Sequence, residues 1–183
     1  MRNARGSGLG RHVVIGALAG AVGTAAMDLV HYRRYRREGG KESLVRWELA
    51  ADVTGWDEAP APGQLGQKAE RLVTGRPAPD AWARSTTNLV HWATGIGWGV
   101  QYGVLAGKTG RHASIRALAL GPVAWLAGYV VLPAAGVYKP IWDYDVWTLA
   151  EDLSGHLVFG TVTSGVFAAL AGRDHAHRKP LVR

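Results

Sequence analysis

The chain has no cysteine, and only two methionines and two phenylalanines occur among its 183 residues. The lack of cysteine excludes disulfide bonds and cysteine nucleophiles, and it leaves the redox compartment undefined. The sequence also lacks the GxSxG and serine–lysine motifs of hydrolases, and its glycine-rich stretches lack the lysine and serine or threonine of a phosphate-binding loop. It contains no RNA- or DNA-binding motif, so we expect no nucleic-acid partner.

Four apolar stretches rich in glycine and alanine divide the chain, and most of the charged residues lie between them. These stretches are Val13–Val30, Asn88–Gly107, Ala117–Tyr138 and Leu153–Gly172. A helix needs about 20 residues to cross the ~30 Å hydrocarbon core of a bilayer. None of the four shows the charged stripe of a soluble surface helix. The sequence therefore predicts an all-α fold, an integral membrane four-helix bundle.

The predicted bundle is a single domain over residues 13–172, with spans at about 13–32, 86–107, 115–138 and 150–172. Residues 1–12 and 173–183 are predicted to be short basic tails. Residues 33–84 form a long loop, which we expect to be helical and to lie at the membrane interface. Within it, Lys41–Val53 is amphipathic with Trp47 as an interfacial anchor, and Gln64–Thr74 is predicted to be a second short helix.

Small residues recur at four-residue spacing in three of the predicted spans. Lipid tails provide no hydrophobic drive for helix association, so such stripes stabilise membrane helices by allowing close backbone approach. We expect them to face the inside of the bundle. The stripes are Gly16, Gly20 and Thr24; Gly95, Gly99 and Gly103; and Gly160 and Ser164.

Ionisable residues continue these stripes at the end of the spans nearest the long loop. Residues four apart lie on one face of a helix, so Asp28, His91 and His156 are predicted to point into the bundle. His31 and Asp152 lie about one turn from Asp28 and His156. An ionisable residue inside a membrane is costly and is therefore a candidate functional residue. The candidate metal ligands are Asp28, His31, His91, Asp152 and His156.

Several kinds of site are compatible with this polar centre. A closed hydrogen-bonded cluster would fix the helix register without any ligand. Histidine and carboxylate side chains would also suit zinc or iron, and two histidines from different helices would suit haem. Titrating histidines would allow proton or ion conduction. The spacings DxxH, NxxH and DxxxH match no tight metal motif, so the cofactor stays undefined.

The charge distribution bears on the orientation of the chain in the membrane. Lys and Arg total 21 against 14 Asp and Glu, and the basic residues divide almost evenly between the two predicted sides. Acidic residues gather on the side of the long loop, with only Asp174 on the side of the termini. This distribution favours both termini in the cytoplasm, whereas the arginine run Arg33–Arg37 favours the reverse.

Four segments together resemble small uncharacterised bacterial inner-membrane proteins of the YagU-like kind. The segments are Gly16–Asp28 (GALAGAVGTAAMD), His91–Gly103 (HWATGIGWGVQYG), Val130–Gly136 (VVLPAAG) and Gly155–Gly165 (GHLVFGTVTSG). The resemblance implies a polytopic protein of the bacterial cytoplasmic membrane without an established activity. It supplies no catalytic residue.

These observations favour a non-enzymatic membrane protein, either a binding module or a subunit of a larger membrane complex. Its expected partners are the lipid bilayer and other membrane subunits or further copies of itself. A metal- or haem-binding membrane enzyme or redox carrier is the alternative, and a proton or ion pathway is a further one. No catalytic residue is predicted for any of these functions.

Overall fold

A computed structural model describes residues 3–108 and 113–177, and the described part of the chain is helical and contains no strand. The all-α prediction is therefore confirmed. The helices, with 3-10 turns labelled η, are α1 (Asn3–Arg37), α2 (Leu44–Glu48), η1 (Trp56–Glu58), α3 (Ala61–Thr74), η2 (Asp80–Trp82), α4 (Ala83–Lys108), α5 (Ala113–Ala134), η3 (Ile141–Asp143) and α6 (Val146–His177).

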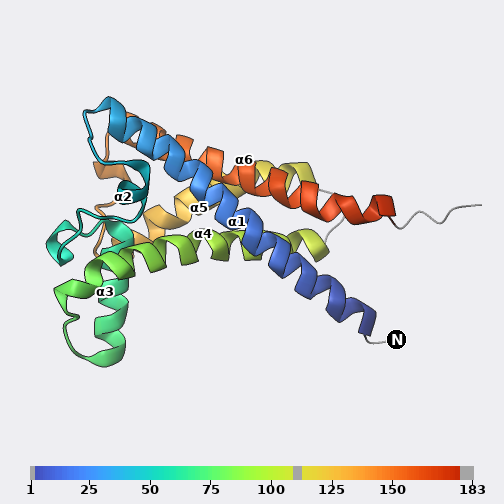
Figure 1. Ribbon diagram of the computed structural model, residues 1–183, viewed down its shortest axis with the longest axis horizontal. Coiled ribbons are helices and arrows are strands. Elements are labelled where there is room, and N and C mark those ends of the chain that lie inside the picture. The colour runs from blue at the N-terminus through green and yellow to red at the C-terminus, as the bar shows by residue number, and fades with distance from the viewer. Residues whose placement is uncertain (1–2, 109–112, 178–183) are drawn as a thin grey trace, which may run out of the picture.

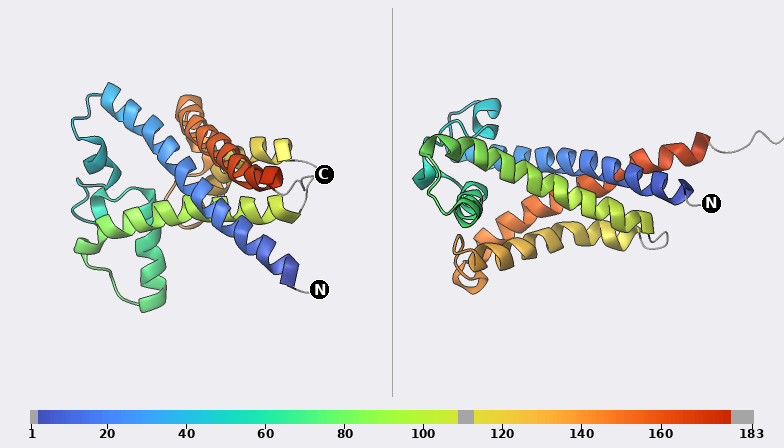
Figure 2. Two further views of the ribbon diagram at one scale, coloured as in Figure 1. Left: turned by 45° about the vertical axis from the view of Figure 1, so that its right-hand side comes forward. Right: turned by 90° about the horizontal axis from the view of Figure 1, so that it is seen from below.

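The four longest helices α1, α4, α5 and α6 run lengthwise and cross one another at an angle (Figure 1). The end of α1, the start of α4 and the connection from α5 to α6 lie at one end of the molecule, together with α2 and α3 (Figures 1 and 2). The start of α1 and the end of α6 lie at the opposite end. Helix α1 packs against both α4 and α6, and α5 packs on α6, whereas α4 and α5 make few contacts with each other.

Glycines bring α1 and α4 into close backbone contact. A Cβ atom added at Gly20 would lie 2.6 Å from the carbonyl oxygen of Gly95 and 3.0 Å from the Cα of Gly99. Gly16 faces Gly99 in the same way, and Gly103 faces the backbone of His12. Real Cβ atoms essentially never approach so closely, so only glycine fits along this seam. The predicted inward orientation of the two glycine stripes is confirmed.

The second close pair is α5 and α6. Gly160 of α6 lies against Gly121 of α5, and Gly121 in turn lies against the backbone of His156. Between α1 and α6, Gly23 packs against Thr163 and Phe159. Aromatic and aliphatic side chains fill the space that these contacts leave, and the buried cluster contains Ile15, Ala19, Tyr102, Leu120, Ala124, Phe159 and Phe167.

The segment between α1 and α4 has a small hydrophobic core of its own. Its buried residues are Val53, Trp56, Ala59, Ala78 and Ala83. The Trp56 indole N–H donates to the carbonyl of Ala78 at 3.0 Å, which joins the two halves of the segment. The predicted helix over Gln64–Thr74 is present as α3. The predicted amphipathic helix over Lys41–Val53 is much shorter, because only α2 is helical there.

Helix boundaries differ from the predicted spans. Helix α1 begins at Asn3, so the part of the predicted tail that the structure describes is helical, and Arg11 donates to the carbonyl of Leu170 at 3.2 Å. Helix α6 likewise extends to His177, into the other predicted tail. Helix α5 ends at Ala134, earlier than predicted, because Pro133 is followed by Gly136 in the left-handed region with a φ of 65°. Residues 1–2, 109–112 and 178–183 lie outside the described part.

Within the described residues, two helices are long and apolar enough to cross a membrane by length and composition. They are Gly8–Arg37 in α1 and Val146–Gly172 in α6. The Leu118–Ala134 segment of α5 is apolar but shorter. Helix α4 has polar residues Asn88, His91 and Gln101 along its length. Two of the four predicted spans therefore meet this criterion.

Candidate metal and ligand site

One cavity of about 450 Å³ is lined by all five residues predicted for the polar centre: Asp28, His31, His91, Asp152 and His156. They come from α1, α4 and α6. The apolar part of the lining includes Trp98 of α4 and Leu132 of α5. The sequence pattern therefore identified the polar lining of a single space, although it did not show which side chains contact one another there.

The closest contact of the site joins α1 to α4. His91 Nε2 lies 2.9 Å from Oδ2 and 3.1 Å from Oδ1 of Asp28. Asp28 is 5% exposed, and His91 is partly buried. Thr24 lies one turn before Asp28, is fully buried and donates to the carbonyl of Gly20 at 2.9 Å. The Asp28–His91 pair thus lies at the end of the glycine seam, because the same four-residue spacing that aligns the glycines also aligns these side chains.

Glu48 of α2 is a third member of this group. One ligand atom from each of Asp28, Glu48 and His91 lies within 4.8 Å of the other two. Burial, together with the neighbouring Asp28 carboxylate, raises the pKa of Glu48 from its usual 4.5 to about 7. Its Oε1 atom is buried and forms no well-aligned hydrogen bond within the described part of the chain, although the Asp28 and Trp92 side chains lie close enough to interact with the carboxylate.

The other three predicted residues gather on the α6 side of the cavity. His156 Nδ1 lies 3.0 Å from the backbone carbonyl of Asp152 and 3.6 Å from its Oδ1. A carbonyl oxygen can only accept, so Nδ1 carries the proton, and a neutral His156 ring has a free lone pair on Nε2. His31 of α1 packs with its Nε2 against Gly155, where a Cβ atom would lie 2.7 Å away.

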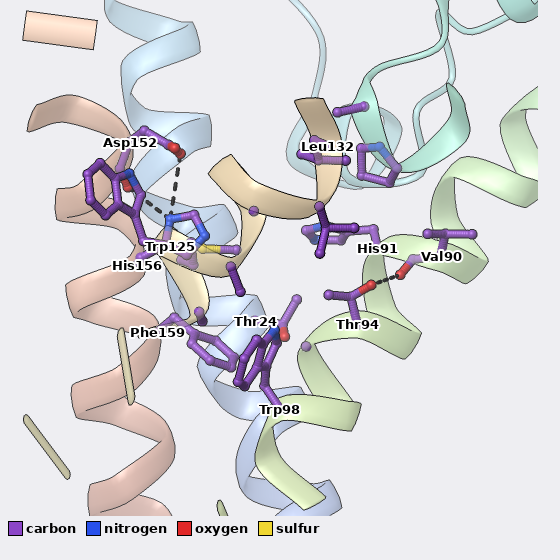
Figure 3. A pocket seen from close by; sticks show the side chains of 18 of the residues that line it. Thr24, Val90, His91, Thr94, Trp98, Trp125, Leu132, Asp152, His156 and Phe159 are labelled. Atoms are coloured by element: carbon purple, nitrogen blue, oxygen red, sulfur yellow. Dashed lines mark hydrogen bonds and ion pairs between the residues drawn. The ribbon is translucent and has the colours of Figure 1, made fainter. Parts of the chain in front are cut away.

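The predicted centre is therefore divided into two groups rather than one cluster. Asp28 and His91 lie between α1 and α4, whereas His31, Asp152 and His156 lie between α1 and α6. Figure 3 shows His156 and Asp152 on one side of the pocket and His91 on the other, with Phe159, Thr24 and Trp98 further along it. Among the described residues, the only group of three close enough to hold one ion is Asp28, Glu48 and His91.

Several polar residues of the site were not predicted from the sequence, among them Glu48, Trp125 and Tyr129. Glu48 lies in the predicted loop, and nothing in its local spacing shows that α2 folds back onto α1 and α4. Trp125 of α5 lines the cavity and has a buried indole nitrogen without a hydrogen-bond partner in the described residues. A tryptophan in an apolar helix usually packs in the core, so the sequence gives no sign that Trp125 lines a site.

Arg34 of α1 joins α1 to the first turns of α6. Its guanidinium donates to the backbone carbonyl of Glu151 at 2.8 Å and to the hydroxyl of Ser154, both on α6. These bonds fix the last turns of α1 beside the first turns of α6, where His31 and Asp152 meet. The arginine run after the first apolar stretch thus includes a structural contact between helices.

No family model matches this chain, and comparisons with curated proteins and with solved structures find no match either. The functional argument therefore rests on the geometry of the site.

Proposed function

We propose that this chain is an integral membrane four-helix bundle that acts as a non-enzymatic binding module for a small amphipathic molecule, such as a lipid. The cavity lined by α1, α3, α4, α5 and α6 carries this proposal. Its volume of about 450 Å³ falls within the usual range of about 300–1,000 Å³ for small-molecule pockets. Its carboxylates and imidazoles are suited to a polar head, and its aliphatic and aromatic walls to an apolar body.

The outer faces of the helices support placement in a membrane. Large apolar side chains are exposed along α1 and α5, on faces that pack against no other described element. Soluble monomers rarely expose apolar patches of this extent, whereas a bilayer covers them. These side chains are Val14, Leu18, Val22 and Leu29 on α1, and Leu118, Val123, Leu126, Val130 and Val131 on α5.

Orientation and location follow as part of the same proposal. The chain would lie in a bacterial cytoplasmic membrane with both termini in the cytoplasm, and the α2–α3 segment would lie at the opposite surface. The acidic residues that gather at that end support this orientation, since only Asp174 lies on the side of the termini.

Filling the cavity tests the proposal. Gly128 of α5 lines the cavity, and a Cβ atom added there would meet no atom within 4 Å, so Gly128→Leu places a side chain in the cavity without a backbone clash. Gly165→Leu on α6 is the matched control, because Gly165 is exposed, has equally open surroundings and does not line the cavity.

The measurement is mass spectrometry of the small molecules that co-purify with each protein from mild detergent. We expect the wild type and Gly165→Leu to retain the same lipid-like species at comparable ratios to protein. Gly128→Leu should retain several-fold less. Equal retention in all three proteins would contradict the assignment of the cavity.

A further inference from the structure

We propose that Asp28, Glu48 and His91 form a binding site for one divalent transition-metal ion. The three side chains come from three different helices, α1, α2 and α4. One ligand atom from each lies within 4.8 Å of the others. Ligands bonded at about 2.1 Å to the same ion lie at most about 4.2 Å apart. A small adjustment of the long Glu48 side chain therefore suffices to enclose an ion.

The charge of the group favours a cation. Two carboxylates lie side by side, and Asp28 is nearly inaccessible to solvent. Within the described part of the chain, neither forms an ion pair with a lysine or arginine, and Asp28 is paired with His91. Carboxylates in low-dielectric surroundings need a compensating charge, which a metal ion would supply.

The buried Oε1 atom of Glu48 is a second observation. Buried polar atoms in folded proteins nearly always have a partner, and an exception needs a physical reason such as an ion or a water molecule. Glu48 Oε1 is buried and forms no well-aligned hydrogen bond within the described part of the chain, although the Asp28 and Trp92 side chains lie close to the carboxylate. A metal ion held between Glu48, Asp28 and His91 would satisfy it.

The ligand types indicate the class of ion. Carboxylate oxygens alone suit Mg²⁺, Ca²⁺ or Mn²⁺, whereas an imidazole nitrogen shifts the preference to zinc, copper, iron or nickel. One imidazole with two carboxylates is thus expected to bind Zn²⁺ in preference to Mg²⁺. The bound ion would attach α2 to α1 and α4. It would thereby fix the segment between α1 and α4 against the C-terminal part of α1 and the N-terminal part of α4.

The test is isothermal titration of chelator-treated, tag-free protein with Zn²⁺ alone and with Mg²⁺ alone. The reference protein carries His175→Ala and His177→Ala, so that the histidines of the C-terminal segment add no binding. We expect one Zn²⁺ per chain and much weaker binding of Mg²⁺. In this background Glu48→Gln should weaken Zn²⁺ binding by about tenfold or more, since a lost ligand costs at least as much as a lost outer-shell partner.

Matched variants keep the test decisive. His156→Gln changes the other histidine group of the cavity and should leave Zn²⁺ affinity unchanged, and His91→Gln should weaken it as Glu48→Gln does. Circular dichroism and elution volume must match the reference protein for each variant that is compared. Zn²⁺ affinity that is unaffected by both Glu48→Gln and His91→Gln, or that is lost on His156→Gln, would overturn the site. Gly128→Leu should leave it intact, so failure of the cavity proposal and failure of the metal site are distinguishable.

Discussion

Single polar residues stabilise helix ends at the end of the molecule that holds α2 and α3. Asp145 directly precedes α6 and caps its first turn. Its Oδ1 accepts hydrogen bonds from the backbone N–H groups of Trp147 and Thr148 at 3.0 Å each, and its Oδ2 accepts one from the Thr148 hydroxyl at 2.6 Å. These bonds, the Thr148 hydroxyl above all, lower the pKa of Asp145 below 3.8. A carboxylate in this position satisfies N–H groups that have no partner within the helix.

Replacing Asp145 tests this cap. Asp145→Ala should lower the thermal unfolding temperature in detergent at neutral pH, and Asp143→Ala should leave it nearly unchanged. The folded pKa of Asp145 is depressed, so its contribution is present above pH 3.8 and is lost as the pH falls through the folded pKa. The difference between the wild type and Asp145→Ala should therefore shrink in acid. A difference that stays constant through this range would contradict the assigned cap.

At the scale of elements, the closest packing is the glycine seam between α1 and α4. Two helices that approach this closely gain dispersion contacts and bury their backbones against each other without needing large side chains. The seam ends at Asp28 and His91, so it also determines the spacing of the proposed metal ligands. Any side chain forced into the seam should affect both stability and the site.

A pair of substitutions on α4 tests the seam. A Cβ atom at Gly99 would lie 2.6 Å from the Cα of Gly20, whereas one at Gly97 would meet nothing within 4 Å. Gly99→Leu should cost about 1–3 kcal/mol of unfolding free energy or more. Gly97→Leu should change it by less than about 1 kcal/mol, because loss of a helix glycine is mildly favourable. Denaturant titration in detergent measures both, and equal effects would show that the seam is not tightly packed.

The helix interiors were predictable because their signal is local. The four-residue spacing of Gly16, Gly20, Thr24 and Asp28 fixes one face of one helix, whatever its neighbours are. The choice of partner for that face is not local, and the sequence did not show that α1 would pair with α4 on one side and α6 on the other. For the same reason the five polar residues were predicted as one centre but form two groups.

The loop segment was predicted less well for a different physical reason. Lys41–Val53 has an amphipathic pattern, yet the chain turns after Glu48 because Val53 and Trp56 pack into a separate small core. Tertiary packing of this kind overrides local helix preference. Glu48 reaches Asp28 only because of that turn, so no spacing rule could identify it as a partner.

The whole molecule exposes large apolar side chains along its helices. The beginning of α1 and the end of α6 lie at the end opposite α2 and α3 (Figure 1). The lack of cysteine makes this arrangement easy to test, because any introduced cysteine is the only thiol in the chain. Val73 at the end of α3 is 86% exposed, and Leu9 in the first turns of α1 is partly exposed at the opposite end.

The proposed orientation predicts opposite labelling of these two positions. In intact bacterial cells, a membrane-impermeant maleimide should label Val73→Cys, and it should label Leu9→Cys only after the membrane is permeabilised. Trp142→Cys, near the α5–α6 connection, should behave like Val73→Cys. The reverse pattern would invert the orientation, and equal labelling of all three positions in intact cells would contradict a membrane-spanning arrangement.

The sparse contact between α4 and α5 has a consequence for how the cavity would be filled. In a bilayer, this side of the cavity would face hydrocarbon, so a molecule dissolved in the membrane would enter sideways without passing through water. Occupancy would then depend on the mole fraction of the molecule among the lipids, and its aqueous solubility would hardly matter. A compound too insoluble to titrate in buffer could saturate the cavity at a small fraction of the membrane's composition.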